Sequence, residues 1–439
     1  MLIMFKVKNH TSFKNESILD LRATSYTQHP THIIKTSTPN INVLKTTAIY
    51  GANASGKSNF ISAMYFFKNY IFSQFISKNE DIMADGSTKE SMLLEPFLLT
   101  DDKEVPSEFE IIFIHNNKQI QFGFECLKNK ILNEWYYIDD KKVYERENEN
   151  ILTYGKPYSD KLAIYNKVPS ERLYISVLEY FLEDTDKKEI IGDFIEFFST
   201  EFNVFSEILF ESSVKKIAGA ATISKKLLED KNFRKKVEEY LSKIDIGIKK
   251  LTVATIDHQK DDGKIIKQKI IKTVHDIYND QGEVIGEKEF GLNQESTGTI
   301  RFLGYIQNVI EMINRGGVFI VDEMSARLHP LLTKLIVDIF QASKNESAQL
   351  IFTTHDISLL NHNQFRRDEV VFVDKNKMGE STLYALSDLK VREDATFNKD
   401  YLQGKYGAIP IFNYSELFGE GWLWHGYNFL NNVLLQRKN

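Results

Sequence analysis

Residues 51–58 read GANASGKS, which matches the phosphate-binding loop pattern G-x-x-x-x-G-K-[ST] at every fixed position. Glycines let the backbone N–H groups of such a loop close around phosphates. The lysine reaches the outer phosphate oxygens, and the last hydroxyl binds Mg²⁺. An apolar stretch at 43–50 predicts a strand before the loop, and helical spacing of apolar residues in 58–75 predicts a helix after it. Strand, glycine loop and helix together predict a site for a nucleoside triphosphate.

The loop supplies most of the candidate binding residues, and ATP and Mg²⁺ are the expected ligands. Lys57 is the candidate catalytic cation, and Ser58 is a candidate Mg²⁺ ligand. The candidate nucleotide-binding residues of the loop are Gly51, Ala52, Asn53, Ala54, Ser55, Gly56, Lys57, Ser58 and Asn59.

A second candidate segment lies far along the chain, where the apolar run 317–321 ends in Asp322 and Glu323. An apolar run of this length is typical of a buried parallel strand. At its carboxyl end, Asp322 is expected to hold Mg²⁺ and Glu323 to polarise the attacking water. Taken alone, an Asp-Glu pair after a buried strand is usually a solvated acidic turn. The presence of a phosphate-binding loop in the same chain favours the catalytic interpretation.

Two further segments make the predicted class more specific than a P-loop NTPase. The apolar run 349–354 precedes His355, which is expected to point at the γ-phosphate from a strand tip. The segment ESTGT at 295–299 opens an amphipathic stretch that predicts a helix, and a helix N-terminus attracts anions. Ser296 and Gly298 are therefore candidate phosphate contacts, although a simple helix cap at Ser296 is the alternative.

This order of motifs resembles the ABC-type ATPases, the class that includes SMC proteins. It resembles most closely the compact AAA-type ATPases of bacterial abortive-infection and anti-phage operons, the AbiL/RloA-like group. The segments that carry the resemblance are NHTSF at 9–13, YGANASGKSNF at 50–60, QESTGTIRFL at 294–303, VDEMSARLHPLL at 321–332, IFTTHD at 351–356 and YLQGKYGAIP at 401–410. The ESTGT segment lacks the Gly-Gly pair of the LSGGQ signature, and the expected Q-loop region at 95–97 contains no glutamine.

The resemblance implies an ATPase that closes as a homodimer or higher homo-oligomer around ATP. Ser296 and Gly298 would then complete the site of the other subunit. It also implies a sensor or motor role in phage defence with a separate effector protein. A DNA-repair or DNA-end-binding ATPase is the alternative, and an ATP-dependent scaffold without turnover is a third possibility.

Composition is consistent with a cytoplasmic protein. The chain has 439 residues, 42% of them hydrophobic, and one cysteine, Cys126, which excludes an internal disulfide framework. No apolar run approaches the ~20 residues of a membrane span, and we expect no signal peptide and no membrane partner. The net charge of −6 argues against a general polyanion binder.

The expected fold class is α/β, a P-loop NTPase of ABC/SMC-head type with an antiparallel β lobe and a helical insertion. Alternating patterns at 109–114, 118–127 and 131–144 predict the β lobe within a first ATPase lobe at 1–155. Helical patterns predict an insertion at 156–248, in which Ser224 could cap a helix that carries Phe233 and Val237. A second ATPase lobe is predicted at 249–439.

Two segments leave alternatives open. Residues 215–250 contain eleven Lys/Arg against five Asp/Glu, which fits either a solvated helix face or a nucleic-acid surface. The aromatic-rich segment 401–429 fits either helices docked on the body or a partner-binding surface.

Overall fold

The computed structural model describes residues 1–75, 94–101, 104–148, 151–205, 223–244, 247–259, 265–392 and 395–410. The nucleotide-binding motifs lie on a six-stranded sheet. Its strand order is β11 (Phe202–Phe205), β15 (Gly317–Val321), β16 (Ala348–Thr353), β5 (Thr46–Tyr50), β17 (Val370–Lys375) and β18 (Ser381–Ala385). The first five strands are parallel, and β18 pairs antiparallel with β17.

The central strands are buried on both faces, which is why their sequences are continuously apolar. Ile49 of β5 faces one hydrophobic core, whereas its neighbours Ala48 and Tyr50 face a second core. In β15, Val318 and Ile320 likewise face the first core, while Phe319 and Val321 face the second. The period of two residues along a strand divides these side chains between the two faces.

Helices cover the sheet on both sides. On the first face, α1 (Lys57–Phe75) packs between this sheet and the β lobe. On the second face lie α9 (Thr297–Arg315), α10 (Pro330–Gln341), α7 (Lys225–Glu229), α8 (Lys231–Lys243) and α11 (Phe397–Leu402). The long helix α9 buries twelve of its residues, and Gly316 in a left-handed conformation (φ 87°) ends it.

The β lobe is a seven-stranded antiparallel sheet in the order β10 (Ile151–Tyr154), β9 (Lys141–Glu147), β8 (Lys130–Ile138), β7 (Lys118–Leu127), β6 (Ser107–His115), β1 (Leu2–Lys8) and β2 (Ser17–Asp20). Aromatic side chains join this sheet to α1. Phe67 lies at the centre of them, 5.6 Å from Phe124 and 5.7 Å from Phe5 between ring centroids. The β lobe therefore holds the helix that begins in the phosphate-binding loop.

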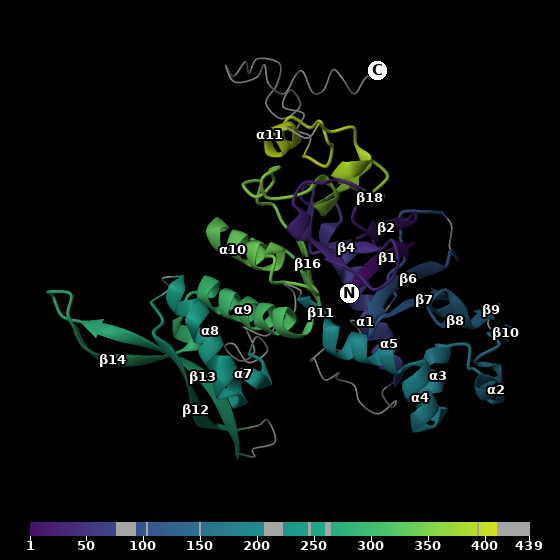
Figure 1. Cartoon of the computed structure of the whole chain (residues 1–439), viewed down its shortest axis with the longest axis horizontal. Helices are drawn as coiled ribbons and strands as arrows, with labels where there is room; N and C mark the ends of the chain where they lie inside the picture. The colour runs from purple at the N-terminus through teal and green to yellow at the C-terminus, as the bar shows by residue number, and fades with distance from the viewer. Residues whose placement is uncertain are drawn as a thin grey trace.

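Smaller helices cover the far end of the β lobe (Figure 1): α2 (Ser159–Leu162), α3 (Tyr174–Phe181), α4 (Asp184–Ile190) and α5 (Gly192–Glu196). At the opposite end of the molecule, β12 (Lys250–Gln259), β13 (Ile265–Tyr278) and β14 (Val284–Gly291) form a separate sheet (Figure 1). The remaining elements are the β3 (Ile33–Lys35) and β4 (Asn42–Leu44) pair, the π-helix η4 (Phe197–Glu201), and the 3-10 helices η1 (Pro30–His32), η3 (Ala163–Tyr165), η5 (Leu292–Gln294), η6 (Arg367–Glu369) and η7 (Leu386–Asp388).

The predicted α/β P-loop fold with an antiparallel β lobe is confirmed, and two local predictions were wrong. The stretch 131–144 forms two strands, because Asp139 and Asp140 adopt left-handed φ values of 50° and 58° and turn the chain. Ser224 caps the short helix α7, where it accepts a hydrogen bond from the Leu227 amide. Helix α8, which carries Phe233 and Val237, is capped by Asp230 instead.

The helices predicted as one insertion pack against two different cores. Helices α3 and α5 belong to the core of the β lobe, whereas α7 and α8 pack beside α9 on the other face of the six-stranded sheet. The boundaries 1–155, 156–248 and 249–439 stay a prediction. Among the described helices, none is both long and apolar enough to cross a membrane.

Parts of the two ambiguous segments fall within the described residues. In the basic stretch, Lys226 pairs with Glu311 and Lys250 with Glu287, so part of its positive charge is balanced within the chain, and both alternatives for this segment stay predictions. Tyr401 stacks on Phe372 in the second core, as expected for a docked helix. Residues 206–222, 245–246 and 411–439, which include the rest of both segments, lie outside the described residues.

Candidate nucleotide-binding site

Three neighbouring parallel strands place the candidate residues at one edge of the sheet. Strand β16 lies between β5 and β15, so the carboxyl ends of all three meet there. The loop 51–56 follows β5, Asp322 follows β15, and His355 follows β16. A pocket of about 490 Å³ opens at this edge, lined by Asn53, Ala54, Ser55, Gly56, Lys57, Ser58, Asn59, Glu323, His355 and Lys375.

Two loop positions have room only for glycine, which is the backbone arrangement that a phosphate-binding loop needs. Gly56 has a φ of 113°, and a Cβ atom there would lie 2.4 Å from Ser381 Oγ. A Cβ atom on Gly51 would lie 2.4 Å from the carbonyl oxygen of Val373. The backbone therefore approaches its surroundings more closely than any side chain allows, which is the property that phosphate-binding loops use.

Lys57 is held beneath the loop by the loop itself. It is 5% exposed, and its Nζ donates hydrogen bonds to the carbonyl oxygens of Gly51 (3.0 Å) and Ala52 (2.9 Å). Burial lowers the pKa of Lys57 to about 8, and the nearby carboxylates of Glu323 and Asp322 only partly oppose that shift. The ammonium group thus lacks a full counter-charge, and a triphosphate would supply one.

Ser58 and Asp322 form the candidate Mg²⁺ position. Ser58 Oγ donates to Asp322 Oδ1 at 3.2 Å. Hydroxyl and carboxylate oxygens are the hard donors that Mg²⁺ prefers, and Mg²⁺ keeps several waters besides them. The donor set therefore fits the predicted ion, with one ligand from α1 and one from the end of β15.

Thr353 at the end of β16 fixes both acids, and sequence analysis missed it. Its Oγ1 donates to Asp322 Oδ1 at 2.6 Å and accepts from the Glu323 amide at 2.7 Å. Glu323 adopts a left-handed conformation (φ 49°), which is unusual for a residue with a long side chain. One hydroxyl thus orients the Asp322 carboxylate and stabilises the turn that points Glu323 into the pocket.

His355 and Lys375 line the pocket from the two strands that flank β5. Burial, followed by the positive charge of Lys57, lowers the pKa of His355, so the neutral imidazole is favoured. His355 lies where the sequence placed it, beside the loop and Glu323. No sequence motif indicated Lys375 as a site residue, because it is the last residue of an ordinary apolar strand, β17.

A cluster of hydroxyl groups supports the loop from below, and it too escaped sequence analysis. Ser381 Oγ donates to the Ser55 carbonyl oxygen at 2.6 Å and lies 2.8 Å from Ser12 Oγ. Asn59 Nδ2 donates to Ser12 Oγ at 2.8 Å. Ser12 belongs to the NHTSF segment, which sequence analysis had noted for its family resemblance. Nothing in the sequence connected Ser12 to Ser381.

The ESTGT segment does not line the pocket of its own chain. Ser296 is exposed and caps α9, accepting from the Thr299 amide at 3.1 Å. Of the described residues that line the pocket, none comes from 295–299. Gly298 lies against the loop after Glu323, since a Cβ atom there would be 2.9 Å from the Arg327 carbonyl oxygen. A role of Ser296 and Gly298 in binding phosphate stays a prediction.

Helix α9 nevertheless contacts the catalytic turn of its own chain. Arg301 is fully buried, and its guanidinium donates to the Glu323 carbonyl oxygen at 3.4 Å and to Tyr305 Oη at 2.9 Å. The expected Q-loop region stands apart from the pocket and binds the NHTSF segment, since the Glu95 carbonyl oxygen accepts from the Thr11 amide.

The fold and the loop together define a P-loop NTPase. The chain belongs to the family described as "AAA domain, putative AbiEii toxin, Type IV TA system", whose profile matches residues 46–361. The match begins in β5 and ends just beyond His355, so it includes every candidate site residue. Membership in the narrower AbiL/RloA-like group stays a prediction.

A comparison with solved structures matches this chain to SMC heads at low similarity. An SMC head bound to the C-winged helix domain of ScpA has 14% sequence identity and a TM-score of 0.39, over 88% of this chain and 97% of that one. The SMC head domain from Thermotoga maritima has 13% identity and a TM-score of 0.38, over 89% and 99%. A comparison with curated protein sequences found no match.

The Thr353 hydrogen bonds lead to a stability prediction. Thr353→Val keeps the side-chain shape but leaves the Asp322 carboxylate and the Glu323 amide without this partner. Burying polar groups without a hydrogen bond costs about 1–3 kcal/mol each, so the free energy of unfolding should fall by at least about 1 kcal/mol. Urea unfolding monitored by tryptophan fluorescence measures it.

Thr47→Val is the matched control. Thr47 is buried in the adjacent strand β5, and its hydroxyl has no hydrogen-bond partner among the described residues. Its replacement should leave stability unchanged or raise it. Equal unfolding free energies for the two variants would contradict the proposed role of Thr353.

Proposed function

We propose that this protein is an Mg²⁺-dependent ATPase that hydrolyses ATP to ADP and phosphate and switches by ATP-driven dimerisation. The main support for the proposal is that the Lys57 loop and Glu323 line one pocket, and that Asp322 is hydrogen-bonded to Ser58 of the same lining. Membership in an AAA-domain family supports it.

Each residue has a defined task in this proposal. Backbone N–H groups of the loop and Lys57 bind the β- and γ-phosphates of ATP, and Ser58 and Asp322 hold Mg²⁺. Mg²⁺, when bound, neutralises phosphate charge. Glu323 accepts a proton from the attacking water, and His355 donates a hydrogen bond to the γ-phosphate oxygens.

Dimerisation is proposed because the ESTGT helix start is exposed and lies outside its own pocket. A helix N-terminus with unpaired N–H groups attracts anions. Ser296 and Gly298 of one subunit would meet the γ-phosphate bound to the other, so ATP would hold the subunits together and hydrolysis would release them. Through its hydrogen bond to the Glu323 carbonyl oxygen, Arg301 would couple the approach of the second subunit to the catalytic turn of its own chain.

A role in phage defence is proposed from the AbiEii-type description of the family. The protein would act as the sensor or motor subunit and pass its state to a separate effector. Stimulation of ATPase activity by a phage protein would support this role. Stimulation by DNA ends, with no response to phage proteins, would favour the alternative of a DNA-repair ATPase.

Lys57→Ala should weaken ATP binding by at least about 100-fold, because hydrogen bonds to charged groups contribute about 1.5–3 kcal/mol each. Titration with a fluorescent ATP analogue measures the affinity. Lys377→Ala, an exposed change on the β17–β18 turn, is the control and should bind normally. Near wild-type affinity of Lys57→Ala would exclude the loop as the nucleotide site.

Glu323→Gln should bind ATP, hydrolyse it at least about 100-fold more slowly, and accumulate as a closed dimer, because an amide cannot act as the general base. The backbone of Glu323 is fixed by Thr353, so the substitution should not move it. Phosphate release and light scattering with ATP measure the two effects. Glu346→Gln is the control, because Glu346 is exposed and does not line the pocket. Turnover of Glu323→Gln at the control rate would rule out Glu323 as the base.

Mixing Lys57→Ala subunits with Ser296→Arg subunits should restore activity. A mixed dimer has one composite site without a lesion, so equal mixing should give about a quarter of wild-type activity if subunits exchange freely. The measurement is ATPase rate against mixing ratio, after exchange is confirmed with labelled subunits. If no mixture exceeds the sum of the two variants, ESTGT acts only as a helix cap.

A further inference from the structure

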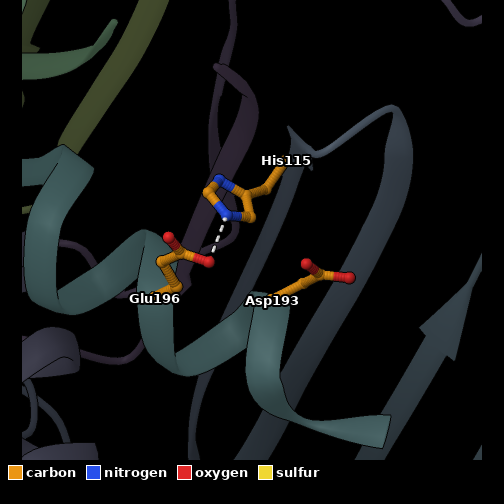
Figure 2. A group of neighbouring side chains, drawn as sticks. All are labelled: His115, Asp193 and Glu196. Carbon is orange, nitrogen blue, oxygen red and sulfur yellow. Dashed lines mark ion pairs between the residues drawn. The ribbon is translucent and has the colours of Figure 1, made fainter. Parts of the chain in front are cut away.

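A second cluster of metal-ligand side chains lies far from the pocket, where the β lobe meets the helices before β11 (Figure 2). His115 is the last residue of β6, and Asp193 and Glu196 lie three positions apart in α5. That spacing puts both carboxylates on the same side of the helix. One ligand atom from each of the three residues lies within 4.8 Å of the other two.

His115 is oriented by a fourth residue. The side chain is 5% exposed, and its Nδ1 lies 3.2 Å from Glu201 Oε1. Its Nε2 is buried without an aligned hydrogen bond, 3.3 Å from Glu196 Oε2. In a neutral imidazole, a proton on Nδ1 directed at Glu201 leaves the Nε2 lone pair facing a carboxylate oxygen. A cation between these two groups, either a proton on Nε2 or a metal ion, would remove the repulsion of the facing lone pairs.

We propose that His115 Nε2, Glu196 and Asp193 bind a divalent first-row transition metal ion of the Zn²⁺ type, with water completing the coordination. A carboxylate behind a ligating histidine, as Glu201 is behind His115, is the usual support of such sites. Ligands at about 2.0–2.2 Å from a tetrahedral ion lie roughly 3.4 Å apart, close to the His115–Glu196 separation. Imidazole with carboxylates favours Zn²⁺ or Mn²⁺ over Mg²⁺.

Asp193 is held by two competing donors. Lys118 Nζ lies 2.6 Å from its Oδ2, and Asn116 Nδ2 donates to its Oδ1 at 2.9 Å. Asp193 must release Lys118 to approach the ion. An open depression lined by Lys118, Asp193 and Glu196 gives the ion a route from solvent. Lys118 therefore sets the affinity by competing with the metal.

The site would connect two parts of the fold. Glu201 leads directly into β11, which pairs with β15, and the Phe205 carbonyl oxygen accepts from the Asp322 amide at 3.0 Å. A bound ion would fix the end of β6 against the segment that supports the acid-tipped strand. Metal binding at this cluster would not depend on the proposed ATPase activity.

The first test is Zn²⁺ binding by the metal-free full-length chain without nucleotide, measured by calorimetry and by metal analysis after dialysis. Glu196→Gln should weaken one site by at least about tenfold; its side chain is 58% exposed, so the fold should persist. Glu189→Gln, in the neighbouring helix α4, is the control and should bind as wild type. Equal Zn²⁺ binding by wild type, Glu196→Gln and His115→Gln would overturn the proposal.

The second test uses Lys118→Met, which removes the competing cation. Zn²⁺ binding should tighten by about threefold or more, since Asp193 no longer has to give up its partly exposed ion pair with Lys118. Unchanged or weaker binding would overturn Asp193 as a ligand and with it the three-residue site. Co²⁺ should give visible absorption bands of nitrogen and oxygen coordination in wild type but not in His115→Gln. The absence of bands in wild type would mean that His115 is only an imidazolium paired with Glu196 and Glu201.

Discussion

The candidate site depends on the pairing of β16 between β5 and β15. Residues 46–49 pair with 350–353, and 317–321 pair with 348–352, so three segments far apart in the sequence end side by side. A shift of one residue would turn each strand's side chains to the opposite core and misplace its terminal residues. The close packing of different side chains in the two cores opposes that shift, which means that packing in the core determines the positions of Ser58, Asp322 and Thr353.

Sequence analysis predicted the parts of the fold that have a strong local signal. The loop 51–58, the acid-tipped strand 317–321 and helix α9 each have a pattern that few other structures produce, and each was found within a few residues of its bounds. The cap of α8 was misassigned, because both Ser224 and Asp230 are good N-cap residues. Which residue caps which helix depends on where the chain turns, and Asp230 has the extended conformation that separates α7 from α8.

The residues missed at the site share a physical reason. Thr353, Ser12, Ser381 and Lys375 are common residue types, and each acquires its role only from a neighbour in space. Ser12 and Ser381 are 369 positions apart, yet their hydroxyl oxygens lie 2.8 Å from each other beneath the loop. No periodicity encodes such a contact. His115 is similar: its environment comes from α5 and η4, about eighty residues later.

The long-range contacts of β5 and of the phosphate-binding loop affect how the chain folds during its synthesis. The loop and its helix are synthesised early, but the strands on both sides of β5, which are β16 and β17, emerge after residue 348, and the hydroxyl support arrives with Ser381. The apolar strand β5 therefore has no sheet partners until about three hundred further residues have been synthesised. Long-range pairing of this kind is slow, and the unpaired strand can aggregate in the meantime. The dense aromatic contacts between α1 and the β lobe, which need only the first third of the chain, would shelter that half-formed sheet until its partners are synthesised.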